Sequence, residues 1–499
     1  MEIIRRKIYD SFIYNLILKI IYTCSFSYIM KPATHKYNNY IKTYHKNIFG
    51  KILSPINKSL DKKYDNIRMI CKKSKTIKVL AKIYINITTQ SILGRLIKEF
   101  NFAYIIAMYI FIDTLIRSKI PVVASIWDEA IFIITIVWLI CRRIFYNKKY
   151  KSSSIDYGLI FFALIYLILA FINSPDINIA IEGYRAVVQH MLWFFLMVQL
   201  LDSKKVIYRT VWIFIIGIGL IGVHGIYQYI TKAPMLGNWV DSAETITTRV
   251  YSITKSPNAL GSLLVLFIPI AFSMIFANED IIKKIIAAFF TIAMSMSILF
   301  TYSRGAWFGV FIAILIFIIF MNKRLIFLVV TAILLLLLNI DALWNRVSYL
   351  FTPEYTNKSM NGGRLYRYYT SIKMWSESKF LGLGIGRYGG AVATNHNLTP
   401  FYMDSYYLKT LTESGIIGFG SFVILILSTI YRLYRYIIGT KIKKDKIIMY
   451  GIFSGLCGVL IQNFVENIFE LPFMVVYFWA LVAVIVSLFK CNEQNNKQI

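Results

Sequence analysis

The hydrophobic pattern of the chain consists of long apolar runs separated by short polar connections. Each run has about the length that an α-helix needs to cross ~30 Å of hydrocarbon. The runs lie at 103–118, 122–140, 155–173, 180–201, 206–230, 258–277, 281–300, 303–320, 325–341, 406–434, 447–467 and 471–489. The pattern therefore predicts an all-α, polytopic transmembrane bundle of 12 spans.

The runs also predict how the chain is divided. Residues 1–100 are rich in lysine and indicate a cytoplasmic or membrane-surface extension, with a basic amphipathic helix on anionic lipid as the alternative. Spans one to nine are expected within 101–341 and spans ten to twelve within 406–490. Between them, residues 342–405 form a long extracytoplasmic loop, and residues 491–499 form a cytoplasmic tail.

Composition supports a membrane protein. Hydrophobic residues make up 57% of the chain and the mean hydropathy is +0.59, whereas soluble proteins are roughly 45–50% apolar. The net charge of +30 comes from lysines and arginines in the N-terminal segment and between the runs. That placement favours membrane topology and argues against a nucleic-acid partner. The five cysteines show no metal-ligand spacing, so we expect no metal site, no disulfide and no cofactor.

Topology follows from the basic connections. With the N-terminus inside, alternate connections become cytoplasmic, and these include Arg142-Arg143, Lys204-Lys205, Lys283-Lys284 and Lys323-Arg324. This arrangement obeys the positive-inside rule. It places both termini in the cytoplasm and the long loop outside. No removable signal peptide is evident.

The long loop is a candidate site because long loops in compact structures carry function or are disordered. Its aromatic residues argue for order, and a helix is expected over 364–378. Arg364 and Arg367 would share one face of that helix, and Arg387 follows. Guanidinium groups match phosphate oxygens, so a cluster of arginines would bind a diphosphate. Simple solvated surface is the alternative for Arg367 and Arg387.

Other arginines are expected on the same side of the membrane. Arg304 interrupts two apolar runs, where a charge must find a partner or reach the interface. An arginine that snorkels to the membrane interface is as good an explanation for Arg304 as a role in binding. A binding role is favoured if other cations converge there. Arg185 and Arg249 are further candidates for the same cavity, with Asn258 following Arg249.

Three titratable residues could act on an acceptor. Asp404 precedes the tenth run and could be a general base, with helix N-capping as the rival role. His396 in the loop is a second candidate base. Glu413 lies inside an apolar run, so we expect it to be partnered within the bundle.

Several motifs together resemble the O-antigen ligase and polymerase family. They are Tyr-Ser-Arg-Gly-Ala-Trp at 302–307, Ser-Pro-Asn-Ala-Leu-Gly at 256–261 with Pro269, Gly363-Arg364, Leu-Gly-Leu-Gly-Ile-Gly at 381–386, and the segment 404–418. The resemblance covers about residues 150–490. It implies a metal-independent glycosyltransferase of the bacterial cytoplasmic membrane, with its active site on the outer face.

The resemblance implies particular substrates and roles. The donor would be an undecaprenyl-diphosphate-linked glycan, and Arg304 and Arg364 would hold its diphosphate. Ligases usually have a histidine nine residues before a glutamate, whereas here Asp404 stands nine residues before Glu413 and His396 lies too early. This departure favours a polymerase-like member that transfers glycan to a glycan acceptor, with a flippase and a chain-length regulator as partners.

Two other functions stay open. An O-antigen ligase or a protein O-oligosaccharyltransferase would use the same donor with a different acceptor. A lipid-linked glycan flippase would share the many spans and basic connections, but it predicts charged residues at mid-membrane positions and short outer loops. Neither the sugar nor the linkage follows from the sequence.

Overall fold

The computed structural model describes residues 100–146, 150–237 and 247–496, together with six positions between residues 62 and 74. The predicted extension over residues 1–100 therefore lies almost entirely outside the described residues. The chain divides into two compact units. The first comprises Met1–Arg95 and Ile140–Lys149, and its described positions are helical apart from Ser74. The second comprises Leu96–Leu139 and Tyr150–Ile499, and it carries the helices that form the site.

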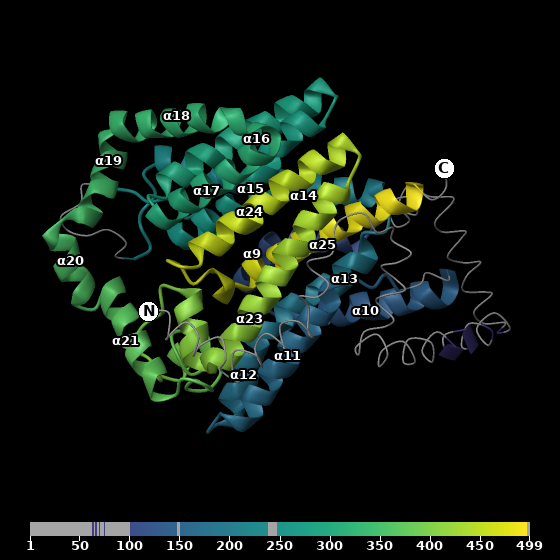
Figure 1. The fold of residues 1–499 in the computed structure, drawn as a ribbon, viewed down its shortest axis with the longest axis horizontal. Helices are drawn as coiled ribbons and strands as arrows, with labels where there is room; N and C mark the ends of the chain where they lie inside the picture. The colour runs from purple at the N-terminus through teal and green to yellow at the C-terminus, as the bar shows by residue number, and fades with distance from the viewer. Residues whose placement is uncertain are drawn as a thin grey trace, which may run out of the picture. The chain divides into compact units, whose positions relative to one another are not determined.

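The described residues form α-helices and short 3-10 helices, with no β-strand among them (Figure 1). The α-helices are α8 (Phe102–Ala107), α9 (Tyr109–Lys119), α10 (Trp127–Tyr146), α11 (Ile155–Ile172), α12 (Ile177–Val188), α13 (Trp193–Leu200), α14 (Lys204–Ile230), α15 (Pro257–Ala277), α16 (Ile281–Phe300), α17 (Arg304–Asn322), α18 (Ile326–Asn339), α19 (Asp341–Ser348), α20 (Pro353–Met360), α21 (Arg364–Glu377), α22 (Ala391–Asn395), α23 (Tyr406–Gly439), α24 (Lys443–Gln462) and α25 (Pro472–Asn496). The 3-10 helices are η2 (Gln189–Leu192), η3 (Ser252–Thr254), η4 (Lys323–Leu325), η5 (Tyr349–Phe351) and η6 (Ile468–Glu470). The all-α prediction is confirmed for this part of the chain.

Within the described residues, eight helices are long and apolar enough to cross a membrane. They are Ile155–Ile172, Lys204–Ile230, Pro257–Ala277, Ile281–Phe300, Arg304–Thr331, Tyr406–Gly439, Lys443–Gln462 and Pro472–Gln494. A polytopic membrane protein is thus confirmed, while the count of 12 spans stays a prediction.

Two of the predicted runs are divided between separate helices. The run at 103–118 is divided between α8 and α9 at Met108, and the run at 180–201 is divided between α12 and α13 by η2. The first interruption has a visible cause. The hydroxyl of Tyr477 accepts the N–H of Ile110 at 3.0 Å and donates to the carbonyl of Ala107 at 3.3 Å. These bonds satisfy backbone groups where the helix is divided.

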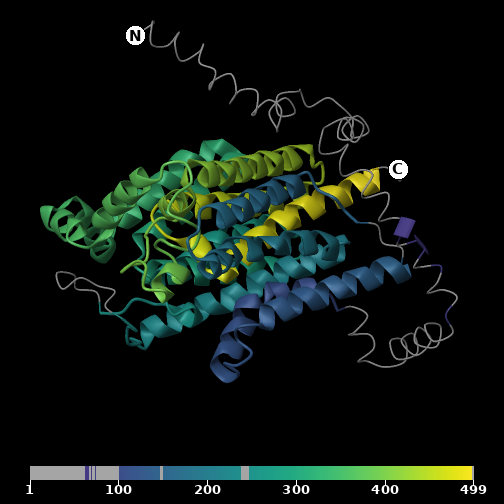
Figure 2. The ribbon, with the colours of Figure 1, turned by 90° about the horizontal axis from the view of Figure 1, so that it is seen from below.

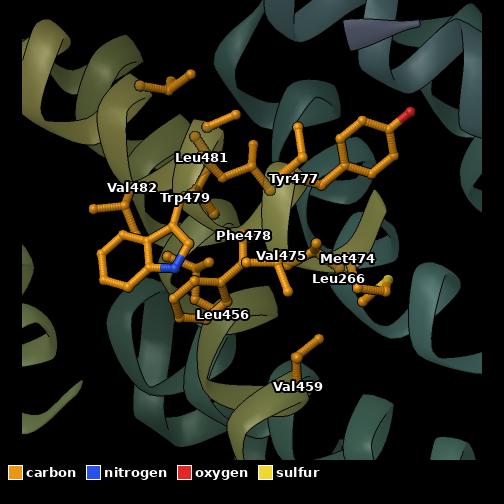
Figure 3. Packing of buried hydrophobic residues seen from close by; sticks show 14 of the residues in the cluster. Leu266, Leu456, Val459, Met474, Val475, Tyr477, Phe478, Trp479, Leu481 and Val482 are labelled. Carbon is orange, nitrogen blue, oxygen red and sulfur yellow. The ribbon is translucent and has the colours of Figure 1, made fainter. Parts of the chain in front are cut away.

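The core of the second unit is built around α15, α24 and α25. Figure 3 shows the buried side chains of α25, including Phe478 and Trp479, packed among residues of α15 and α24. Small residues let the helices approach closely: a Cβ at Gly458 of α24 would lie 2.8 Å from the carbonyl oxygen of Gly309 in α17. Close packing of this kind is how helices associate in membranes, where lipid is as apolar as the protein.

The segment from α19 to α22 lies between α18 and α23 in the chain, within the residues predicted to form the long loop. In Figures 1 and 2, α19, α20 and α21 follow one another in an arc at one end of the long helices. The expected loop helix is confirmed as α21, which ends at Glu377, one residue before the predicted boundary. Whether this segment lies outside the cell stays a prediction.

A break in α23 receives the chain that follows α21. Gly415 has φ +60° and ψ −167°, a backbone conformation that is almost restricted to glycine. The break frees the carbonyls of Thr412 and Glu413, which accept the N–H groups of Leu383 and Gly384 at 2.9 and 3.0 Å. The glycine-rich turn after α21 is therefore fastened to α23 by backbone hydrogen bonds.

Gly415→Ala should destabilise the protein. The alanine would be strained by about 1–3 kcal/mol at this φ and ψ, and its Cβ would clash with the carbonyl oxygen of Phe380. We expect a lower midpoint of thermal unfolding in detergent. Gly420→Ala is the matched control, because no atom lies within 4 Å of its Cβ position in the same helix. Equal midpoints for the two variants would contradict this account.

Candidate active site

The first turns of α21 carry two arginines on one face. Arg364 is the first residue of the helix and Arg367 lies at i+3, so both side chains reach the same neighbour. Arg364 Nε lies 3.8 Å from Asp404 Oδ1, and Arg367 Nη1 lies 2.9 Å from Asp404 Oδ2. The expectation that these two arginines share a helix face is confirmed. Both arginine side chains are about 30% exposed.

Asp404 is held at the start of α23 without capping it. The N-cap of α23 is Ser405, whose Oγ accepts the N–H of Leu408 at 3.3 Å. The rival interpretation of Asp404 as the N-cap was therefore wrong, because the adjacent serine takes that role. The carboxylate of Asp404 instead faces Arg364 and Arg367. Asp404 is thus a fixed carboxylate among cations.

A second carboxylate of the site, which our sequence analysis missed, lies between α24 and η6. Glu466 Oε1 accepts Arg364 Nη2 at 2.6 Å, and the Glu466 side chain is only 11% exposed. Burial raises the pKa of Glu466, and the positive charges of Arg364 and Arg249 oppose that rise. The signal in the sequence is a glutamate at the end of an apolar run, which must find a partner.

Arg304 approaches the same place from the start of α17. Its Nη1 donates to the carbonyl of Arg346 at 3.3 Å, and its guanidinium lies 5.2 Å from the ring centroid of Tyr355. Tyr355 also interacts electrostatically with Arg364. The residue after Arg304 is Gly305, whose Cβ position is 3.8 Å from Glu466 Oε1. The start of α17 therefore packs directly against Glu466.

Arg249 completes the group from the segment before η3. It is 6% exposed, and its Nε donates to the carbonyl of Thr301 at 2.8 Å. Its Nη2 donates to Asn258 Oδ1 at 3.2 Å, so Asn258 orients the guanidinium. Because Arg249 lowers the pKa of Glu466, its charge acts on the same buried carboxylate. We call Arg249, Arg304, Arg364, Arg367, Asp404 and Glu466 the arginine cluster.

The electrostatics of the cluster favour the ionised form of Arg364. Burial alone would lower the pKa of Arg364, but Glu466 and Asp404 together raise it above its usual value. Burial raises the pKa of Tyr368 to about 12, so this tyrosine stays neutral, and its hydroxyl donates to the carbonyl of Asp404 at 3.4 Å. Arg249, Arg364 and Arg367 act on the two carboxylates, an excess of positive charge that suits an anionic ligand.

The other predicted binding residues have different partners. Arg185 pairs with Glu129 and donates to Gln189 at 3.1 Å. His396 Nε2 lies 3.0 Å from Glu182 Oε2. Arg387 lies at the glycine-rich turn, with its side chain against Gly384. The contacts that join the arginine cluster include none of these three, and their predicted roles stay predictions.

Glu413 has the partner that its burial requires. Its Oε2 lies 3.2 Å from the ammonium of Lys409, one turn earlier in α23. The expectation that Glu413 is partnered within the bundle is confirmed. In the part of the chain that the structure describes, no three histidine, cysteine, aspartate or glutamate side chains are placed to hold a metal ion.

The fold defines a polytopic membrane protein, and the arginine cluster is its candidate site. Residues 286–423 match the model of the family described as O-Antigen ligase, which confirms the resemblance to the O-antigen ligase and polymerase family. No curated protein matches the chain. The matched residues include Arg304, Arg364 and Asp404, while Arg249 and Glu466 lie outside them. The match indicates a membrane enzyme of O-antigen or surface-polysaccharide assembly that is similar to glycosyltransferases.

Removing Arg364 should make stability depend more strongly on pH. Without that cation, the pKa of the buried Glu466 rises further, while Asp404 keeps Arg367 as a partner. A carboxyl whose folded-state pKa is raised favours the folded state at low pH and loses that contribution as pH rises through the folded pKa. For Arg364→Met, we expect a larger loss of thermal midpoint at about pH 8 than at about pH 5.

The control is the double variant Arg364→Met/Glu466→Gln, in which the buried group no longer titrates. Its loss of thermal midpoint relative to wild type should be similar at both pH values. If Arg364→Met also shows the same loss of thermal midpoint at both pH values, Arg364 does not control the pKa of Glu466 and this account is contradicted.

Proposed function

We propose that the protein is a polymerase-like glycosyltransferase that moves a glycan from undecaprenyl diphosphate to a glycan acceptor in surface-polysaccharide assembly. The observation that carries the proposal is that Arg364 contacts both Asp404 and Glu466 and Arg367 contacts Asp404. Arg304 lies at the start of α17, which packs against Glu466. Arginine forks bind phosphate oxygens bidentately, and a diphosphate ester carries one negative charge on each phosphate. The positive excess of the cluster fits that charge.

The reaction would be an inverting substitution at the anomeric carbon of the donor sugar. The acceptor hydroxyl oxygen forms a bond to this carbon, and the bond between the carbon and the phosphate oxygen breaks. The bonding electrons leave with undecaprenyl diphosphate, whose growing charge Arg304 and Arg364 stabilise. The hydroxyl proton passes to the carboxylate of Asp404, which acts as general base.

Asp404 must exchange partners for this to occur. In the absence of donor, its two carboxylate oxygens face Arg364 and Arg367. A bound diphosphate competes for these guanidinium groups, and the carboxylate that it displaces becomes free to accept a proton. Donor binding would therefore activate the base. Glu466 would keep Arg364 in place, because its carboxylate is more deeply buried than that of Asp404.

The proposal places both termini in the cytoplasm and the arginine cluster at the outer face of the cytoplasmic membrane. Its support is the distribution of basic residues over alternate connections, together with the position of the cluster. The start of α15, the start of α17, the end of α24 and the start of α23 all meet there. These four helix ends therefore lie at the same end of the bundle, because α24 runs antiparallel to α15, α17 and α23. A lipid-linked donor would meet the cluster near the level of the phosphate headgroups.

A transfer assay in liposomes tests the proposal. With a lipid-diphosphate glycan as donor, wild type should lengthen glycan chains, and Arg364→Ala and Asp404→Asn should each reduce the rate by about 100-fold or more. Arg117→Ala is the control, since Arg117 forms only an exposed ion pair with Asp113. His396→Ala should keep the rate, because the proposed base is Asp404.

Other outcomes would redirect the assignment. Transfer to a core oligosaccharide or to a protein, without chain lengthening, would indicate a ligase or a protein O-oligosaccharyltransferase. Movement of labelled donor across the bilayer by an otherwise inert wild type would indicate a flippase and overturn the enzyme. A normal rate in Asp404→Asn together with loss in His396→Ala would transfer the role of base to His396.

Metal dependence is a separate test. The proposed mechanism stabilises the leaving group with arginines, so we expect the transfer rate to be unchanged, within about twofold, after dialysis against EDTA. The same preparation with added Mg²⁺ or Mn²⁺ is the control. A loss of activity that either ion restores would contradict a metal-independent reaction.

A further inference from the structure

A second charged cluster lies one turn further along α23. The ammonium of Lys409 lies 2.7 Å from Glu470 Oε2 and 3.2 Å from Glu413 Oε2. The three side chains are at most 8% exposed. Removing one partner from a buried ionic group leaves an uncompensated charge, which is strongly destabilising. These residues must therefore meet whenever the protein folds.

Each glutamate of this cluster also holds a backbone group of the segment before α22. Glu413 Oε1 accepts the N–H of Tyr388 at 3.1 Å, and Glu470 Oε1 accepts the N–H of Ala391 at 2.9 Å. The segment passes very close: a Cβ at Gly390 would lie 2.5 Å from Glu470 Oε1 and 2.6 Å from Lys409 Cε. Lys409 thus joins α23, the segment before α22 and η6.

The connection between α24 and α25, which Lys409 contacts through Glu470, also carries Glu466. The N–H of Tyr406 donates to the carbonyls of Asn463 and Glu466 at 3.1 and 3.3 Å. These bonds fix the beginning of the segment against the first turn of α23. Lys409 lies on the same side of the helix, at i+3 from Tyr406, and fixes the end of the segment through Glu470.

We propose that Lys409 is a positioning residue for the transfer reaction, because its ion pair with Glu470 sets where Glu466 stands relative to Asp404. The inference rests on the proposed function. Asp404 lies two residues before Tyr406, and Glu466 and Asp404 both contact Arg364. A shift of the segment between α24 and α25 would move the carboxylate of Glu466 and leave that of Asp404 in place. Arg364 would still bind the donor, but its fork would no longer have the orientation that stabilises the departing diphosphate.

Lys409 acts through other residues. Its ammonium contacts Glu413, Glu470 and the ring of Tyr406, whose centroid lies 5.9 Å away. None of these belongs to the arginine cluster. Misplacement of about 1 Å by a residue outside the chemistry is enough to reduce a rate by about 100-fold. Substrate binding, by contrast, depends on guanidinium groups that the substitution leaves in the protein.

The experiment measures kcat and donor KM in the liposome assay. Glu470→Gln keeps an acceptor for Ala391 and leaves Lys409 and Glu413 as a neutral pair, so this variant should fold. We expect kcat to fall about tenfold or more, with KM changed less than threefold. Lys409→Met should show the same loss if it folds, and Lys409→Arg should restore most of kcat because it keeps the charge.

Tyr166→Phe is the matched control. It removes a buried hydrogen bond of 3.1 Å to Ser414 of α23 without touching the segment that carries Glu466. It should lower the thermal midpoint but keep kcat. If Glu470→Gln keeps kcat within twofold, or loses it no more than Tyr166→Phe does, the role of Lys409 is only structural and the inference fails. If wild type transfers no glycan, the proposed function fails and the inference falls with it.

Discussion

Ionised side chains in an apolar bundle are stable only when opposite charges and hydrogen bonds surround them, and this requirement governs how the helix ends meet. Glu466 lies buried beyond the end of α24 and needs Arg364 from α21. Lys409 lies buried in α23 and needs Glu470 from η6. The segments before α22, before α23 and between α24 and α25 are thereby brought together.

The two charged clusters differ in one physical respect. In the cluster around Lys409, all four glutamate oxygens have a partner and the side chains are buried, so the cluster is complete without a ligand. In the arginine cluster, positive charge exceeds negative charge and the side chains of Arg364 and Arg367 are partly exposed. A complete network gives rigidity, whereas an incomplete one leaves capacity for a ligand. For this reason we propose that the cluster around Lys409 is structural and that the arginine cluster binds the substrate.

Sequence reasoning succeeded where the cause was local. The helix over α21 and the shared face of Arg364 and Arg367 follow from residues within a few positions of one another. It failed for Glu466, whose partner Arg364 is 102 residues away in the chain. Its rival role for Asp404, as the N-cap of α23, was wrong because it did not weigh the adjacent Ser405.

Hydropathy has a similar limit. It detects apolar length but not helix breaks that depend on distant side chains. The run at 103–118 is continuous in hydropathy, yet the helix is divided there. The hydroxyl of Tyr477 binds the backbone of Ile110 at the break, although the two residues are 367 positions apart. The broken helix α23 is likewise invisible to hydropathy, although Gly415 marks the place in the sequence.

The hydroxyl of Tyr477 has a consequence for biosynthesis. Among the described helices α25 is the last to leave the ribosome, yet its tyrosine holds the junction of α8 and α9, which leave first. The side chains of α25 also fill the space between α13 and α14. Nascent chains generally fold from the N-terminus as they emerge. In this protein the earliest helices must wait in the membrane, incompletely packed, until the final helix inserts and closes the assembly.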